Sequence, residues 1–248
     1  MGVITVVTSG KGGVGKSTVA AGVGAALARR RRRVLLIDGD AGLSCLDLML
    51  GVAEEKVFDI ADVICGAAAP AQAIYQCPWQ EGLFLLPAPA QVEDIASPEV
   101  MRHLVPALAR YYDHVLVDCP AGLGRGFESA AATASRALVV STPDPVCLRN
   151  SSKAGLALAQ HGIAQTRLVV NRFSGAEFVR QNVFHNLDEA IDIAGIRLIA
   201  VIPQDFALAA AAANGQAPAP RGKGVMALER LAARLEGEQV PLASLSKF

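Results

Sequence analysis

The chain has 248 residues, 52% of them hydrophobic, and its 23 basic and 23 acidic residues give a formal net charge of zero. This length accommodates one large α/β domain, and the neutral charge makes nucleic acid an unlikely partner because it excludes a general attraction to polyanions. The five cysteines show no CxxC pair and no histidine at metal-ligand spacing. We therefore expect reduced thiols in a cytoplasmic protein, without a disulfide framework or a zinc site.

Short apolar runs recur along the chain between longer helical segments. They are rich in Val, Ile and Leu and lack polar alternation, as in strands covered on both faces of a parallel sheet. With right-handed crossovers, they predict an α/β fold: a doubly wound, mostly parallel sheet of about seven strands with helices on both faces. The predicted strands are residues 3–8, 34–38, 83–87, 114–118, 137–141, 167–171 and 198–203.

Several signals place helices and boundaries. Residues 18–30 repeat apolar positions at helical spacing, and Ser97 before Pro98 has the residue types of a helix start. The arginine run 29–33 follows the first helix, where cations suit the helix dipole. We predict a single P-loop domain over residues 1–237, including an alanine-rich helix and surface loop near residues 209–224, and a tail over residues 238–248.

The glycine-rich stretch SGKGGVGKST lies between the first predicted strand and the first predicted helix. Gly10 to Ser17 fits the pattern GxxxxGK[ST] of a phosphate-binding loop in the context that the pattern requires. Backbone N–H groups of such a loop surround phosphate oxygens, while Lys16 bridges phosphates and the Ser17 hydroxyl binds Mg²⁺. The predicted nucleotide-binding residues here are Gly10, Lys11, Gly12, Gly13, Val14, Gly15, Lys16, Ser17 and Thr18.

Lys11 is one lysine more than this loop needs. With it, residues 11–18 read KGGVGKST and resemble the deviant Walker A loop of the MinD and ParA family of ATPases. Other segments resemble the same family in consistent order, over about residues 3–205. They are VLLIDGDAGLSCLDLMLG, HVLVDCPAGLGRGF, ALVVSTPDPVCLR, LVVNRF and AVIPQD.

The resemblance implies a role for each lysine of the loop. Lys16 serves the ATP of its own subunit, and Lys11 reaches across a nucleotide-sandwich homodimer to the phosphates of the partner, as an arginine finger does. A solvated lysine in an exposed loop is the alternative for Lys11. By this resemblance we expect Lys11 and Lys16 to be catalytic, together with Asp40.

Three aspartates follow apolar strands. Asp38 and Asp118 each end a predicted strand, which places both at the carboxyl edge of the sheet, where ligands bind in such folds. Because Mg²⁺ keeps several waters and takes few protein ligands, we expect Ser17, Asp38 and Asp118 to form the metal site. By resemblance, Asp40 orients or deprotonates the attacking water; a solvated turn carboxylate is the alternative.

The resemblance also implies how the base is bound. It assigns Asn171, followed by Arg172, to contacts with adenine, and Pro203 to the start of a loop over the base edge. Simple turn chemistry is the alternative for these strand-end residues. ATP and Mg²⁺ are the implied cofactors.

The sequence departs from the family pattern in two segments. Cys45 stands where the first switch usually carries asparagine, which affects how nucleotide state is communicated. Asn150 to Lys153 lack the acidic residues that often follow the arginine of this loop. A division inhibitor of the MinC type is the partner that the resemblance implies, and the missing acidic residues affect how it would dock on the helix that begins here.

The tail offers Leu242, Leu245 and Phe248 on one face of a helix, with Lys247 as its only cation. Eight such residues bind an anionic membrane weakly alone, but two tails in a dimer gain avidity. We therefore expect reversible, peripheral association with the inner face of the cell membrane; a frayed, inert tail is the alternative.

Together these features predict an ATP-dependent dimerising ATPase switch that acts in septum placement. Alternatives are a flagellar-number regulator of the same family, a DNA-partitioning ATPase, and a nucleotide-gated scaffold with vestigial hydrolysis. Salt-sensitive binding to duplex DNA would favour the partitioning ATPase, whereas vesicle binding that depends on the tail would favour septum or flagellar placement alike. Measurement of ATP turnover distinguishes the scaffold.

Overall fold

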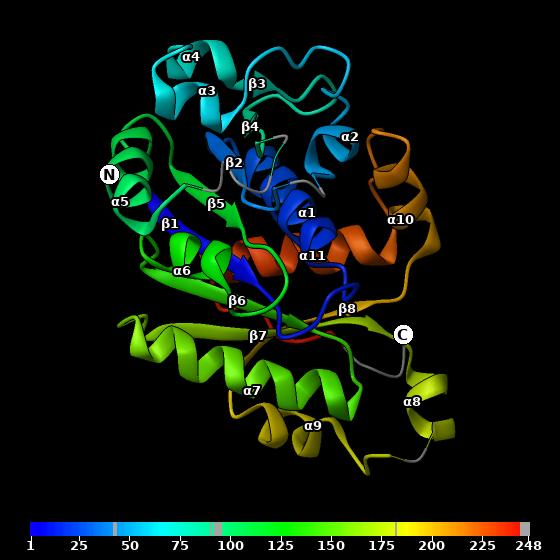
Figure 1. Ribbon diagram of the computed structural model, residues 1–248. Helices are drawn as coiled ribbons and strands as arrows, with labels where there is room; N and C mark the ends of the chain where they lie inside the picture. Colours follow the sequence, from blue (N-terminus) through cyan, green and yellow to red (C-terminus); the bar gives the residue numbers. More distant parts are fainter. Residues whose placement is uncertain (42–43, 90, 92–95, 182, 244–248) are drawn as a thin grey trace.

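The computed structural model describes residues 1–41, 44–89, 91, 96–181 and 183–243. In this part of the chain eight strands form one sheet, in the order β3-β4-β2-β5-β1-β6-β7-β8, with helices on both faces (Figure 1). All neighbouring strands are parallel except β3 and β4. The predicted doubly wound α/β sheet is therefore confirmed. The strands are β1 (Val3–Thr8), β2 (Val34–Asp38), β3 (Tyr75–Gln76), β4 (Leu83–Leu86), β5 (His114–Asp118), β6 (Arg136–Ser141), β7 (Gln165–Phe173) and β8 (Leu198–Pro203).

The helices cover the two faces of the sheet in two groups. Alternate residues of each central strand point to opposite faces, so that Val6 packs with one group and Val7 with the other, both fully buried. This is why the strands read as continuous apolar runs. The helices are α1 (Lys16–Arg29), α2 (Leu46–Leu50), α3 (Ile60–Cys65), α4 (Pro70–Ala73), α5 (Pro98–Leu108), α6 (Arg125–Ala131), α7 (Pro145–Gln160), α8 (Gly175–Gln181), α9 (Leu187–Ala194), α10 (Phe206–Ala213) and α11 (Lys223–Leu235).

Two strands differ from the sequence prediction by more than one residue. β3 was not predicted, because a two-residue strand is too short to show any periodicity. It pairs antiparallel with β4 at the edge of the sheet. β7 extends beyond the predicted residue 171 to Phe173, with an irregular register against β8 between Val170 and Phe173. Asn171 and Arg172 therefore lie within this irregular end of β7 and not after it.

The arginine run joins the end of α1 to the end of α11. Arg30 Nε lies 2.7 Å from Glu236 Oε2, and Arg32 pairs with the other oxygen of the same carboxylate. Glu236 is the C-cap residue of α11. These arginines thus fasten the last helix of the fold to the first, in addition to ending α1.

Replacement of Arg31 by glycine is expected to stabilise the protein. Arg31 has φ of 63° in the left-handed region, which costs an L-residue about 1 kcal/mol and costs glycine almost nothing. We expect a gain of up to about 1 kcal/mol, or a rise in Tm of about 2–4 °C, measured by thermal unfolding. Arg31→Ala is the control because it removes the same charge but keeps the Cβ; equal effects of the two variants would contradict this account.

The tail has no regular structure as far as the structure describes it. The Val240 carbonyl accepts a hydrogen bond from Arg234 Nε at 2.8 Å, and Leu242 is half exposed. Leu245, Lys247 and Phe248 lie outside the described residues. Across the described part of the chain, no helix has both the length and the apolar character needed to cross a bilayer.

Candidate nucleotide-binding site

The glycine-rich loop connects β1 to α1 at the carboxyl edge of the sheet. Gly13 and Gly15 have φ of 78° and 86°, in the left-handed region that favours glycine. A Cβ on Gly15 would lie 2.4 Å from Asn171 Nδ2, whereas one on Gly13 would meet nothing within 4 Å. The loop is therefore closed against β7 at Gly15 and open in front of Gly13, where a ligand can approach its backbone.

Gly10 is required by a contact that the sequence did not predict. A Cβ at this position would lie 2.3 Å from the carbonyl carbon of Asn150 in α7. Helix α7 thus packs directly on the loop backbone. No motif of the sequence signals this contact, because it joins segments about 140 residues apart through a main-chain atom.

Lys16 and Asp118 form a buried ion pair at the base of the loop. Lys16 Nζ lies 2.8 Å from Asp118 Oδ1, and the two side chains are 8% and 1% exposed. Burial raises the pKa of Asp118, and the charge of Lys16 opposes this rise. For Lys16, burial favours the neutral amine, but the attraction of Asp118 offsets it and leaves the pKa raised. Lys16 is therefore charged and oriented by Asp118.

Asp38 lies beside Asp118, because β2 and β5 pair in a register that places these two residues opposite each other. Its Oδ1 accepts a hydrogen bond from the Asp40 backbone N–H at 3.0 Å, and its Oδ2 accepts one from the Ser44 hydroxyl at 3.0 Å. Burial, with a contribution from Asp118, raises the pKa of Asp38 to about 6. The structure thus brings the two predicted strand-end carboxylates together, and Ser44, which the sequence analysis did not single out, orients one of them.

The residues present fit a triphosphate with Mg²⁺. Asp118 Oδ2 is buried and has no hydrogen-bond partner within the described residues, so one carboxylate oxygen is left for a metal-bound water. Ser17, at the first turn of α1, lies near it, with its hydroxyl 3.5 Å from Lys16 Nζ. The backbone in front of Gly13 is open. Cation, carboxylate, hydroxyl and bare backbone together form the donor and acceptor set of a P-loop.

Lys11 and Asp40 lie at the mouth of this site. The Lys11 side chain is exposed and makes no hydrogen bond or ion pair with any residue that the structure describes. Its charge contributes, after the backbone N–H of Cys147, to the lowered pKa of Asp144, the N-cap residue of α7. Asp40 is partly exposed and close to Lys16 and Asp118, whose pKa values its charge raises. Residues 42 and 43 of the predicted first switch lie outside the described residues.

Two of the three residues predicted to contact the base, Asn171 and Arg172, lie near Gly15 at the other end of the loop. Asn171 is buried, and its Nδ2 donates to the Val14 carbonyl at 2.8 Å. Arg172 is exposed and has φ of 54°, a strained conformation for arginine. Pro203 ends β8 at the same edge of the sheet, next to the end of β7. The sequence therefore located these three residues together, although it did not predict the hydrogen bond between Asn171 and the loop.

The cysteines near the site are protonated thiols. Burial raises the pKa of Cys45, which is half-buried at the start of α2, and raises that of fully buried Cys119 to about 12. No group of three or more metal-ligating side chains occurs among the described residues. The residues on either side of Cys45 donate hydrogen bonds to Asp38 Oδ2. Ser44 donates through its hydroxyl at 3.0 Å, and Leu46 donates through its backbone N–H at 3.4 Å.

Replacement of Asp38 by asparagine is expected to stabilise the nucleotide-free protein at neutral pH. The pKa of this acid rises from 3.8 to about 6 on folding. Between these two pH values the folded protein binds more protons than the unfolded chain, so the wild type loses stability as the pH rises from one to the other. We expect the variant to be more stable by about 1–2 kcal/mol near pH 7 and about equal near pH 4. Urea denaturation at both pH values measures this.

The control for that experiment is Asp192→Asn, which removes an exposed carboxylate of α9. A stability gain of the Asp38 variant that does not change with pH would contradict the assignment of the lost stability to the ionisation of this carboxylate.

The fold and the site define a P-loop nucleotide-binding protein. Residues 5–219 match the family described as the CobQ/CobB/MinD/ParA nucleotide binding domain. The septum site-determining protein MinD of Bacillus subtilis is 35% identical to the chain over 253 residues, which cover 100% of this chain and 94% of that protein. The chain belongs to the CobQ/CobB/MinD/ParA family.

Solved structures agree with this assignment. A chain of the MinC:MinD cell division protein complex of Aquifex aeolicus is 33% identical, with a TM-score of 0.87 and 98% of each chain covered. The septum site-determining protein MinD of Pyrococcus horikoshii complexed with Mg-ADP is 33% identical, with a TM-score of 0.85 and 95% and 96% of the two chains covered. The predicted resemblance to MinD and ParA ATPases is therefore confirmed.

Proposed function

We propose that the chain is a MinD-like ATPase that acts in septum site determination and uses ATP-dependent dimerisation as its switch. The septum-site names of its full-length relatives support the cellular role, and the complete P-loop supports the chemistry. The observation that carries the switch is Lys11. This second lysine has no ion-pair partner among the described residues, and it lies at the mouth of a loop whose own lysine, Lys16, is already held by Asp118.

The roles of the site residues follow from their positions. The loop backbone, with Lys16, holds the phosphates, and Lys16 exchanges Asp118 for them when ATP binds. Ser17, Asp38 and Asp118 hold Mg²⁺ and its waters, which neutralise phosphate charge. Asp40 is close enough to this site for its charge to act on Lys16 and Asp118, and it orients or deprotonates the attacking water.

Adenine is the base that the orientation of Asn171 favours. One N–H of its Nδ2 donates to the Val14 carbonyl, which orients the amide against the loop, and Oδ1 is the acceptor that it offers to a base. The exocyclic amino group of adenine donates a hydrogen bond to such an acceptor, whereas the oxygen at the same position of guanine is repelled. Arg172 and Pro203 flank this position at the ends of β7 and β8.

Dimerisation follows from electrostatics at the mouth of the site. A γ-phosphate approached by Lys11 of a second subunit gains contacts that exist only in the dimer, so ATP favours the dimer and loss of the γ-phosphate releases it. The chain therefore works as a cytoplasmic timer. In the dimer two tails (residues 238–248) act together on an anionic membrane surface, and a MinC-like protein is the partner, by analogy with the Aquifex complex.

Light scattering in ATP, in a non-hydrolysable analogue and in ADP tests the switch, together with phosphate release. Dimers are expected with the first two ligands and monomers with ADP. Monomers under all three conditions, with measurable turnover, would overturn the switch but not the enzyme. Turnover that is absent while the dimer forms would favour the scaffold alternative.

Membrane binding is tested separately by co-sedimentation with phosphatidylglycerol vesicles. Recruitment is expected with ATP, and it should be lost on deletion of residues 241–248. Salt-sensitive binding to duplex DNA in place of vesicle binding would instead favour the partitioning alternative.

A further inference from the structure

Five arginines lie where the amino edge of the sheet meets the last turns of α11. Arg136 is the first residue of β6, Arg167 lies near the start of β7, and Arg197 directly precedes β8. These three strands are neighbours in the sheet, and the Arg197 carbonyl accepts a hydrogen bond from the backbone N–H that follows Arg167. With two residues of α11 they form a set that we call the arginine patch: Arg136, Arg167, Arg197, Arg230 and Arg234.

The strand arginines of the patch point to the face of the sheet that α11 covers. Side chains two residues apart along a strand lie on the same face. Arg136 comes two residues before Leu138 of β6, which packs in the core cluster that includes α11. Arg167 stands in the same relation to Val169 of β7. The Arg136 guanidinium also donates to the Leu235 carbonyl, at the end of α11, at 2.8 Å.

The α11 arginines connect the patch to the tail. Arg230 and Arg234 are four residues apart and therefore share one side of the helix. Arg234 donates through Nη1 to the Ile199 carbonyl of the edge strand β8, and through Nε to the Val240 carbonyl of the tail. The tail thus leaves the fold beside the arginine patch.

No carboxylate neutralises the patch. Among the described residues, none of its five guanidinium groups forms an ion pair. Burial lowers the pKa of Arg136, with a contribution from Arg167, and it lowers the pKa of Arg234, with a contribution from Arg230. These like charges are therefore close enough to repel one another, and an anion placed against them would relieve the repulsion.

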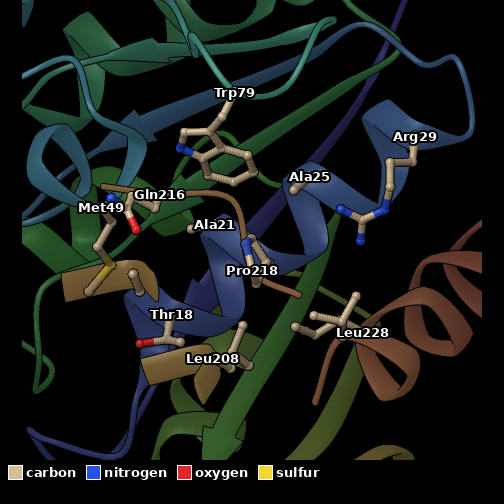
Figure 2. Close-up of a pocket in the computed structure, with 13 residues that line it drawn as sticks. Thr18, Ala21, Ala25, Arg29, Met49, Trp79, Leu208, Gln216, Pro218 and Leu228 are labelled. Carbon is tan, nitrogen blue, oxygen red and sulfur yellow. The ribbon is translucent and has the colours of Figure 1, made fainter. Parts of the chain in front are cut away.

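The α1 side of α11 differs, because its charges are paired. There Leu228 packs on α1, whose last residue is Arg29 (Figure 2). Arg29 pairs with Glu229 at 3.2 Å, and Glu236 pairs with two further arginines that follow α1. The chain as a whole is neutral. The arginine patch is therefore a local excess of positive charge on one side of α11, suited to an external anion.

We propose that the arginine patch binds the head groups of an anionic phospholipid bilayer, next to the point where the tail leaves the fold. The inference rests on the membrane association proposed above and names a second surface that takes part in it. The tail has Lys247 as its only cation and binds a membrane weakly by itself, whereas a basic patch adds attraction to anionic lipids. Leu242 of the tail is half exposed, and an apolar side chain beside cations suits a bilayer better than a nucleic acid.

The patch stays accessible in the proposed ATP dimer. It lies at the amino edge of the sheet, whereas Lys11 follows β1 at the carboxyl edge. A second subunit that meets Lys11 therefore covers the opposite edge and does not compete with a bilayer. Lipid binding at the patch is expected with ADP as well as with ATP.

Co-sedimentation of the full-length protein with phosphatidylglycerol vesicles at low ionic strength tests the proposal. The variant combines Arg197→Gln and Arg230→Gln, since neither side chain makes a hydrogen bond or ion pair with a described residue. An arginine near an anionic surface contributes about fivefold in affinity, so the double variant should bind about 25-fold more weakly with either nucleotide. Equal binding by the wild type and this variant would overturn the proposal and leave the tail as the membrane anchor.

Two further double variants separate charge from position. Arg197→Lys with Arg230→Lys keeps both charges and should bind within about twofold of the wild type; a loss as large as that of the glutamine variant would overturn the electrostatic account. Arg102→Gln with Arg180→Gln removes two exposed arginines of α5 and α8 and should bind as the wild type does. Equal weakening by this control would overturn the location.

Comparison of the two nucleotides separates the patch from the ATP switch. Binding that depends on Arg197 and Arg230 but does not increase with ATP would support the patch and overturn the ATP dependence of membrane association. An increase with ATP that is independent of both arginines would do the reverse. Loss of duplex DNA binding in the glutamine variant, with unchanged vesicle binding, would assign the patch to nucleic acid and overturn the proposal, as would equal binding of the wild type to phosphatidylcholine vesicles or no vesicle binding at all.

Discussion

Substitution of Lys11 by alanine is expected to lower ATP turnover about 1,000-fold and to abolish ATP-dependent dimerisation, while ADP binding stays nearly unchanged. The reason is that the Lys11 ammonium group is exposed and has no partner of its own within the described chain, so its contribution arises only when it approaches the phosphates of a second subunit. Phosphate release and light scattering measure the two effects. The control is Lys153→Ala, which removes an exposed lysine of α7.

A mixing experiment distinguishes action in the partner from action within one subunit. A mixed dimer of Lys11→Ala and Asp40→Ala subunits has one site with both groups if Lys11 acts across the interface, and none if it acts within its own chain. Equal amounts, mixed before ATP is added, should recover activity well above that of either variant alone; random pairing, in which half of the dimers are mixed and have one active site of two, would give about a quarter of the wild-type rate. No recovery, from variants shown to form mixed dimers, would contradict the role of Lys11 in the partner.

Substitution of Asp40 by alanine is expected to slow hydrolysis about 100–1,000-fold and to leave the ATP dimer intact. Asp40 is near Lys16 and Asp118 but is not hydrogen-bonded through its side chain to either of them, so its loss removes the group that acts on water and keeps the phosphate-binding loop. Light scattering after ATP addition should therefore show dimers that persist far longer than those of the wild type.

Asp188→Ala is the control for this measurement, because it removes an exposed carboxylate at the start of α9. Unchanged turnover of the Asp40 variant would reject its role in activating water. Slow turnover combined with a failure to dimerise would instead assign Asp40 to the assembly of the dimer.

Much of the fold was predictable because its signals are local. Apolar runs gave the long strands, and the start of α5 was read from Ser97 and Pro98, where the Ser97 hydroxyl indeed accepts from the Val100 N–H at 3.4 Å. β3 and the extension of β7 were missed, because each depends on pairing with a neighbouring strand and leaves no periodicity of its own. The domain boundary at residue 237 stays a prediction, which limited proteolysis would test.

The residue types of the site were predictable, but their relations were not. The loop motif and the strand-end positions identified Lys16, Asp38 and Asp118 as candidates. Only the register of β2 against β5 shows that the two carboxylates are neighbours, and only the fold shows that Lys16 is held by Asp118 before any nucleotide binds. The catalytic and binding roles assigned to these residues stay predictions, with the experiments above as their tests.

The sequence by itself determined the fold class, the phosphate-binding loop and the family, because each rests on residue types at short spacing along the chain. The tertiary structure decided how those parts act on one another. It set the pKa of Asp38 through burial and through Asp118, and it placed Asn171 Nδ2 on the Val14 carbonyl of the loop. Burial and electrostatic coupling depend on distances between residues that are remote in sequence, and only the folded chain fixes those distances.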